Sequence, residues 1–229
     1  MELVGTVAVI HRSLFVSNIN GSLKGIAGKL WEERETLLKL QAGGALIVTH
    51  SDITITRSTF KGNSAGVGGA IFGDVDSNIT IFASMFDGNR AANLNNNTDC
   101  FGGALYVQSG CRLIIQGCIF NSNTAICKRE GNSTEVCVGG AIAAVGGAEV
   151  CIVWSSLSQN HAVDGGAIIV RDVVMNLDRN VFSNNKASLS GGAIYVSGRS
   201  STNIFRSNFS CNQAHVYGAI WTDGHLLCY

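Results

Sequence analysis

The sequence predicts an all-β protein, a right-handed single-stranded parallel β-helix (a solenoid) of about seven coils, on three observations. A Gly-Gly-Ala-Ile/Leu tetrapeptide recurs, and each complete copy is followed 17 or 18 residues later by Phe/Leu-x-x-Asn-x-Ala. Proline is absent, as expected of strands that are paired on both sides. The basic period of 25 to 26 residues is too short to bury a core alone, so the repeats must stack. The tetrapeptides begin at Gly43, Gly68, Gly102, Gly139, Gly165, Gly191 and, with Tyr in place of the first Gly, Tyr217.

The residues after each Gly-Gly alternate with the period of two that a strand requires. When the repeats are aligned, equivalent residues of successive coils form columns. In the coil that begins at Gly165, Ile168 and Val170 belong to columns that we expect to face inward. A second strand follows, with aliphatic residues seven and five positions before the Phe or Leu and polar residues between them. A corner rich in Ser leads to a third short strand that carries the Phe. The winding is expected to be right-handed, as parallel crossovers are.

Two columns of the aligned repeats are nearly uniform. The aromatic column predicts a stack inside the helix and consists of Phe60, Phe86, Phe120, Leu157, Phe182 and Phe209. The polar column predicts a ladder of side-chain amides that bond from coil to coil, and consists of Asn63, Asn89, Asn123, Asn160, Asn185 and Asn212.

All variation in repeat length falls in the connection between this Asn and the next Gly-Gly, which indicates loops that leave one corner of the stack. We expect residues 1–229 to form one β-helix domain with an insertion at residues 21–42. The stretch from Lys29 to Leu40 has helical spacing and mixed charge, and predicts a short helix lying against the stack.

The pairing of Gly-Gly-Ala-Ile/Leu with Phe-x-x-Asn in a repeated array resembles the repeats of the chlamydial polymorphic outer membrane proteins, over about residues 5 to 225. The resemblance implies a β-helix displayed at the cell surface, with a role in adhesion. The next Phe of the array would fall near position 235, beyond Tyr229, so we expect the chain to be a stretch of a longer protein whose export and anchoring segments lie elsewhere. A eukaryotic secreted relative remains an alternative to a bacterial one.

The composition excludes several classes of function. The 16 basic and 16 acidic residues balance without a basic stripe, so we expect no nucleic-acid partner. No apolar run approaches the 18 residues of a membrane helix, so we expect no membrane-spanning segment in this chain. No phosphate-binding loop and no paired metal-ligand spacing occurs, and no cofactor or metal is expected.

Two outward columns are candidates for binding a protein or glycan at the cell surface. One is apolar and includes Phe72, Tyr106, Tyr195 and Trp221; the alternative is that the inserted loops or the segment 29–40 cover it. The other lies three residues before the Phe and includes Arg179 and Arg206, together with Arg12 and Arg57. It is either a solvated basic edge or a place that captures an acidic glycan.

Modification is suggested by eight cysteines and five sequons. Cys127 and Cys137 bracket an insertion, while Cys100 and Cys137 occupy one column in successive coils, so either pair could form a disulfide; buried thiols are the alternative. The sequons are glycosylation candidates in a secreted eukaryotic protein, and they begin at Asn20, Asn78, Asn96, Asn132 and Asn208.

The leading hypothesis is a non-enzymatic, extracellular or cell-surface β-helix for adhesion or recognition. The alternative is a polysaccharide-active β-helix of the pectate-lyase type whose site lies outside this chain. Such chemistry needs carboxylates gathered on one face. Here Asp74 and Asp223 share a column but lie several coils apart, and the histidines share none.

Overall fold

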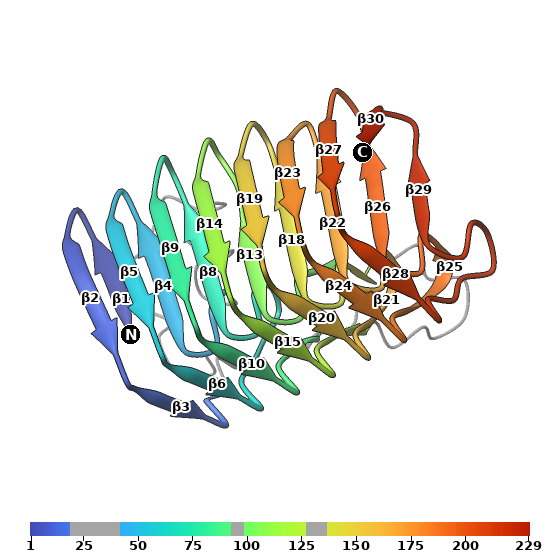
Figure 1. Ribbon diagram of the computed structural model, residues 1–229. Helices are drawn as coiled ribbons and strands as arrows, with labels where there is room; N and C mark the ends of the chain where they lie inside the picture. The colour runs from blue at the N-terminus through green and yellow to red at the C-terminus, as the bar shows by residue number, and fades with distance from the viewer. Residues whose placement is uncertain (19–41, 93–98, 127–136) are drawn as a thin grey trace.

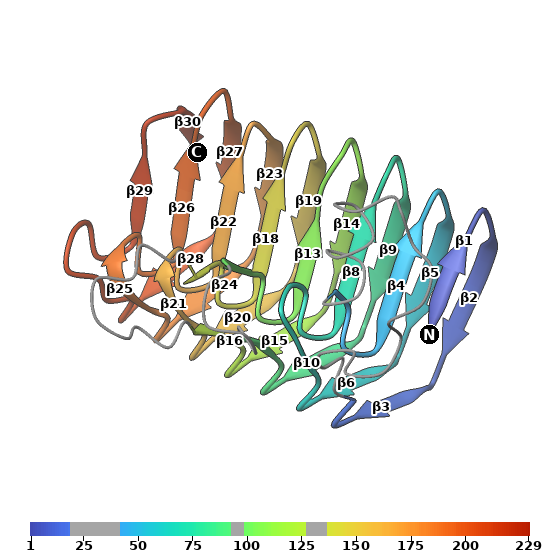
Figure 2. The ribbon, with the colours of Figure 1, turned by 180° about the vertical axis from the view of Figure 1, so that it is seen from behind.

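A computed structural model describes residues 1–18, 42–92, 99–126 and 137–229 as a right-handed parallel β-helix. Successive coils stack along one axis, so the chain colour changes steadily from the N-terminal to the C-terminal end (Figures 1 and 2). No helix occurs among the described residues. The predicted helix at 29–40 and most of the insertion at 21–42 lie outside them.

Three sheets carry the strands that the repeats predict. Sheet I contains β1 (Glu2–Val4), β4 (Leu46–Thr49), β8 (Ile71–Asp74), β13 (Leu105–Val107), β18 (Ile142–Val145), β22 (Ile168–Arg171), β26 (Ile194–Ser197) and β29 (Ile220–Thr222). Sheet II contains β2 (Val7–His11), β5 (Asp52–Thr56), β9 (Asn78–Phe82), β14 (Arg112–Gln116), β19 (Glu149–Val153), β23 (Val174–Asp178), β27 (Ser201–Phe205) and β30 (His225–Cys228). Sheet III contains β3 (Leu14–Val16), β6 (Thr59–Lys61), β10 (Met85–Asp87), β15 (Ile119–Asn121), β20 (Ser156–Ser158), β24 (Val181–Ser183) and β28 (Asn208–Ser210).

The structure contains a fourth sheet, in addition to the three strands in each coil that the sequence predicts. Sheet IV contains β7 (Ser64–Ala65), β11 (Arg90–Ala92), β12 (Cys100–Phe101), β16 (Thr124–Ile126), β17 (Cys137–Val138), β21 (His161–Asp164) and β25 (Lys186–Ser190). Its strands carry the Ala of the Phe-x-x-Asn-x-Ala motif, for example Ala125 and Ala162, which are buried. The sequence hides these strands because they are short and because the insertions interrupt them.

The insertions leave from sheet IV, as the spacing of the motifs predicts. β21 pairs at its start with β16, through His161 and Thr124, and at its end with β17, through Asp164 and Val138. A coil with an insertion thus contains two short strands where a coil without one contains a single continuous strand. The strands before and after the insertion, β16 and β17, both pair with β21, so the stacking register is the same on both sides of the insertion.

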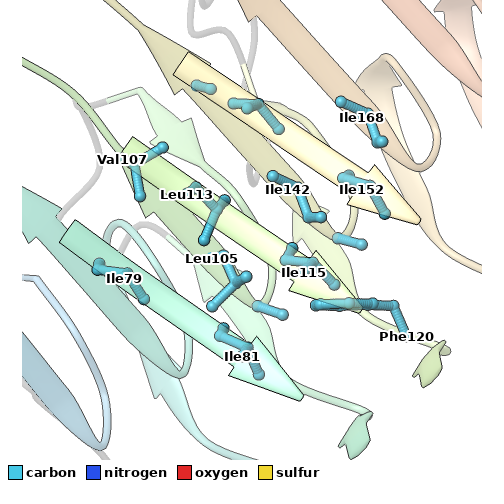
Figure 3. Packing of buried hydrophobic residues seen from close by; sticks show 14 of the residues in the cluster. Ile79, Ile81, Leu105, Val107, Leu113, Ile115, Phe120, Ile142, Ile152 and Ile168 are labelled. Atoms are coloured by element: carbon cyan, nitrogen blue, oxygen red, sulfur yellow. The ribbon is translucent and has the colours of Figure 1, made fainter. Parts of the chain in front are cut away.

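The core lies between the sheets, where aliphatic side chains from successive coils pack on one another (Figure 3). The predicted aromatic stack is confirmed: the rings of Phe60 and Phe86 lie 4.8 Å apart and those of Phe86 and Phe120 lie 4.7 Å apart, nearly parallel. Leu157 interrupts the stack, which resumes with Phe182 and Phe209 at 4.7 Å. Phe60, Phe86, Phe120 and Phe182 are fully buried and Phe209 is partly buried, so the stack is a main source of stability.

The predicted asparagine ladder is also confirmed. The backbone N–H and the side-chain Nδ2 of Asn89 both donate to Oδ1 of Asn123, at 2.9 and 3.0 Å. Asn123 in turn donates from Nδ2 to the carbonyl of Phe86. Each amide therefore satisfies a buried corner in the preceding coil, which would otherwise contain unpaired backbone groups.

The two glycines of each tetrapeptide are required for different reasons. The first has a left-handed backbone, with φ of +62° at Gly165. The second packs against the next coil, so a Cβ on Gly166 would lie 2.1 Å from the carbonyl oxygen of Gly192. Only glycine allows the backbones of adjacent coils to approach this closely.

Candidate functional site

The apolar column on the outer face of sheet I forms a second hydrophobic cluster instead of a continuous exposed stripe. Phe72 is 1% exposed and Tyr106 is 6% exposed, so neither can serve as a contact for a ligand. The described residues that cover them directly precede Gly-Gly, and include Val67, Phe101 and Val138. The ring of Phe101 lies 5.2 Å from that of Tyr106. This part of the column is therefore covered by the residues directly before Gly-Gly, whereas the alternative taken from the sequence was cover by the inserted loops or by the segment 29–40, which lies outside the described residues.

A chain of hydrogen bonds holds Tyr106 in this buried position. Its hydroxyl donates to Oε1 of Gln108 at 2.6 Å, and Nε2 of Gln108 donates to Oδ1 of Asp74 at 3.1 Å. Burial, and secondarily the charge of Asp74, raise the pKa of Tyr106. The residue is thus a neutral, structural tyrosine.

The column opens toward the C-terminal end. The rings of Tyr195 and Trp221 stack at 4.2 Å, and both residues are only partly buried. The position before Gly-Gly is Ser190 in the coil of Tyr195 and Val216 in the coil of Trp221, where Tyr217 replaces the first Gly.

Charged groups surround this open aromatic pair. Burial raises the pKa of Tyr195, and the carboxylates of Asp164 and Asp223 raise it further, while the charge of Arg171 opposes them. Two of the four aromatic residues expected to bind a ligand are therefore placed where a ligand can reach them.

The column with Arg179 and Arg206 lies at the corner between sheets II and III, and its backbone is left-handed throughout. The φ angle is +54° at Arg179, +43° at Arg206 and +55° at Trp154, which occupies the same position one coil earlier. A left-handed residue at a corner directs its side chain away from both strands. The side chains of this column consequently form an exposed ridge.

Arg179, Arg206, Trp154 and Asp178 make one connected cluster on this ridge. The Arg179 guanidinium lies over the Trp154 ring, with Cζ 4.5 Å from the ring centroid. Asp178 forms an ion pair with Arg179, at 3.5 Å between Oδ2 and Nη1, and its Oδ1 accepts from Nε of Arg206 at 3.2 Å. Trp154 is 58% exposed, and the side chain of Arg206 is 63% exposed.

The cluster continues into an aromatic pair at the end of sheet II. The rings of Phe205 and Tyr229 stack at 4.9 Å, and Phe205 directly precedes Arg206. Phe205 also pairs in register with Asp178 of the preceding coil. We call the set Trp154, Asp178, Arg179, Phe205, Arg206 and Tyr229 the corner ridge.

Sequence reasoning identified the two arginines of the corner ridge but missed their partners. The signal for Trp154 was its place in the arginine column, where it is an apolar exception. The signal for Asp178 was its place directly before Arg179, the last outward position of a strand. Neither residue repeats from coil to coil, so the repeat pattern does not reveal them.

The carboxylates of the described residues do not gather. Asp74 is buried and accepts from Gln108, while Oδ1 of Asp172 accepts from the backbone N–H of Arg199 at 2.9 Å. In the described ranges, no group of three or more His, Cys, Asp or Glu residues is placed to hold a metal ion. The same ranges contain no helix with the length and apolar character of a membrane span.

Among the described cysteines, one forms a disulfide and the others do not. Cys137 forms a disulfide. Cys100 lies in register with Cys137, and its Sγ donates to the carbonyl of Ile126 at 3.8 Å, so of the two pairings that the sequence left open, Cys100–Cys137 does not form. Cys127 lies outside the described residues. Cys118 is a buried thiol that replaces a corner serine, as expected.

Two of the five sequons fall in the described part of the chain. Asn78 begins β9 and is exposed, with Nδ2 donating to Oδ1 of Asp52 at 2.7 Å. Asn208 begins β28 and is exposed as well. Asn20, Asn96 and Asn132 lie outside the described residues.

Comparison with known proteins identifies the repeat. The family model of the Chlamydia polymorphic membrane protein repeat matches residues 57–74 and 181–197. Both segments run from the corner or the Phe-x-x-Asn motif through sheet IV to the strand after Gly-Gly. No curated protein and no solved structure matches the chain.

Proposed function

We propose that this β-helix, which carries repeats of the Chlamydia polymorphic membrane protein type, is a non-enzymatic protein of the cell surface that recognises acidic glycans in adhesion. The name of the matched repeat supports a membrane-associated, surface-displayed protein. The ligand class is argued from the corner ridge, the single feature on which the proposal rests.

The corner ridge has the composition of a site for charged sugars. Exposed indole rings stack on the apolar faces of pyranoses, and arginine binds carboxylate or sulfate groups through two parallel N–H donors. Trp154 supplies such a ring next to Arg179, and Phe205 and Tyr229 supply a second aromatic surface next to Arg206. The alternation of ring and guanidinium fits a polymer that alternates sugar faces and anionic groups.

The charge balance of the ridge favours an anionic ligand. Arg179 and Arg206 share the single carboxylate of Asp178, so the three groups together retain one positive charge. Ion pairs this exposed stabilise a protein by only about 1 kcal/mol or less. A ligand carboxylate or sulfate can therefore take over one guanidinium at small cost.

The open aromatic pair Tyr195–Trp221 on sheet I offers a second contact surface. It lies on a different sheet from the corner ridge, so we assign it to another part of an extended ligand or to a protein partner. Phe72 and Tyr106 contribute to the fold and not to this surface.

The test is binding to immobilised acidic polysaccharide, with neutral dextran as the blank. Replacing Arg179 and Arg206 together with Gln should weaken binding at least about 10-fold, since each charge-assisted hydrogen bond contributes about 1.5–3 kcal/mol. The matched control is Arg12→Gln with Arg57→Gln. These arginines occupy the same left-handed column without a tryptophan beside them, and their loss should change affinity less than about 3-fold.

Equal losses in the two double variants would indicate non-specific charge attraction and contradict a built site. Shortening of the polysaccharide during incubation would instead favour the enzymatic alternative, a polysaccharide-active β-helix. Size-exclusion chromatography of the polymer before and after exposure to the protein distinguishes binding from cleavage.

A further inference from the structure

A hollow on the outer face of sheet IV is lined by polar side chains that neither the repeat motifs nor the corner ridge explains. His161, Lys186, Ser188, Gln213 and His215 line it, together with Ala187 and Ala214. It lies on a different sheet from the corner ridge and depends on none of its residues.

The register of the strands brings these side chains together from three successive coils. His161 of β21 pairs with Lys186 of β25, and Lys186 forms a parallel bridge with Gln213. Adjacent coils lie about 4.8 Å apart, so the three side chains form a continuous column. Ser188 and His215 each follow a member of that column by two residues and therefore point to the same side of the sheet.

The hollow concentrates groups that donate hydrogen bonds or carry positive charge. Lys186 supplies an ammonium group, Gln213 an amide N–H and Ser188 a hydroxyl, while His161 and His215 each supply a ring N–H. Within the described ranges, Lys186 takes part in no salt bridge. The carboxylate on β21, Asp164, accepts from the backbone N–H of Ser190 at 2.9 Å.

Within the described ranges, the pKa of His161 is shifted by burial and by a positive charge. Burial lowers the pKa of His161, and the nearby charge of Lys186 lowers it further. On the other side, β16 presents the uncharged Thr124 in register with it. Among the described residues no carboxylate contributes to the pKa shift of His161, so a bound anion would supply a counter-charge to its protonated form.

We propose that this hollow binds an oxyanion of the sulfate type, either as a free ion or as the sulfate group of a glycan. Lys186 contacts the anion at the centre, with His161 and His215 on either side and Gln213 and Ser188 as neutral donors. The bound anion stabilises the imidazolium form of His161 and thus raises its pKa. By linkage, binding strengthens as the pH falls through the histidine range.

The experiment follows the histidine Cε1–H resonances of the full chain by NMR while sodium sulfate replaces sodium chloride at constant ionic strength. The resonances of His161 and His215 should move in a saturable manner, and those of the exposed His11 and His225 should not. Sulfate affinity at pH 5.5 should exceed that at pH 7.5 about 10-fold, which corresponds to a stabilisation of one pKa unit. A sulfated disaccharide tested in parallel separates the two sources, because tighter binding than inorganic sulfate identifies a glycan ligand and equal binding a free ion.

Lys186→Gln is the decisive variant, since this exposed side chain can be changed without disturbing the core. It should weaken sulfate binding about 10-fold, whereas Lys61→Gln, at an exposed lysine paired with Asp87, should leave it unchanged. His215→Gln provides a second, equally exposed variant if Lys186→Gln folds poorly. The proposal is overturned if Lys186→Gln binds sulfate like the unmodified protein, or if all histidine resonances shift alike.

Discussion

Arg179 lies over the ring of Trp154, one coil away at the same left-handed corner, with its guanidinium carbon 4.5 Å from the ring centroid. The stacking occurs because adjacent coils place equivalent side chains about 4.8 Å apart, close to the ideal separation for a cation over an aromatic face. A corner column of a β-helix thus aligns side chains of different chemistry at a spacing suited to stacking.

Trp154→Ala should separate recognition from folding. The exposed cation–π contact contributes only about 0.5–1 kcal/mol, so the free energy of unfolding measured in urea should fall by less than about 1 kcal/mol. Binding to acidic polysaccharide should weaken much more. A loss of stability above about 2 kcal/mol would show that Trp154 has a structural role, and would remove this residue from the proposed site.

Phe182→Ala should destabilise the protein by about 3–5 kcal/mol, because it leaves a cavity in the buried aromatic stack. Phe182→Leu should cost clearly less, since Leu157 already occupies the same column and is itself buried. Chemical denaturation followed by circular dichroism measures both. Equal losses for the two variants would contradict the stacked arrangement.

Asn123→Ala should remove about 2–4 kcal/mol of stability, because two buried N–H groups of Asn89 and the carbonyl of Phe86 lose their partner together. The control is Asn176→Ala on the exposed face of sheet II. Its Oδ1 accepts from Asn203 near water, so its replacement should change stability by less than about 0.5 kcal/mol. If the two variants unfold at the same urea concentration, the buried ladder does not stabilise the fold as we describe.

The interior of this protein could be predicted from sequence because equivalents of Phe182 and Asn185 occupy the same position in almost every coil. The repeated residue type at a position indicates whether that position is buried. The fate of Phe72 and Tyr106 could not be predicted in the same way, because their burial depends on Val67 and Val138 from another column. The apolar residue before Gly-Gly is a partial signal for that burial, but it is not sufficient, because Ile169 is buried although Asp164 precedes its coil. The corner ridge depends on backbone angles and on residues that do not repeat, and for that reason only its arginines were predicted.

Gly166→Ala should unfold the array or lower its stability by more than about 3 kcal/mol, since the added Cβ would meet the carbonyl oxygen of Gly192. Gly88→Ala is the matched control. Gly88 has a φ of +62°, but a Cβ there would meet no other atom. Gly88→Ala should therefore lower stability by only about 1 kcal/mol, the cost of a left-handed backbone at alanine. Thermal unfolding of the two variants should therefore differ clearly, and similar melting temperatures would argue against close approach of the coils at Gly166.

The cysteines should differ in reactivity toward iodoacetamide at pH 8. Cys211 and Cys228 are exposed and should be alkylated in the native protein, whereas Cys111 and Cys118 should react only after unfolding. Burial raises the pKa of Cys111 from 9.0 to about 11, so its thiolate is disfavoured in the folded state. Its contribution to stability is complete below pH 9 and declines as the pH rises toward 11. Mass spectrometry of the modified peptides checks the order of reaction, and rapid native labelling of Cys111 would contradict its burial.

Sheet IV tolerates changes in chain length. The pairing of β21 with β25 shifts by one residue between Ala162 and Asp164, and in coils with an insertion two short strands replace one. The paired motifs on either side fix the pitch of the coil regardless of what lies between them. Length can consequently change at this one place without altering sheets I, II and III. Three sheets therefore set a constant frame, and a change in chain length at the fourth leaves the pairing of their strands intact.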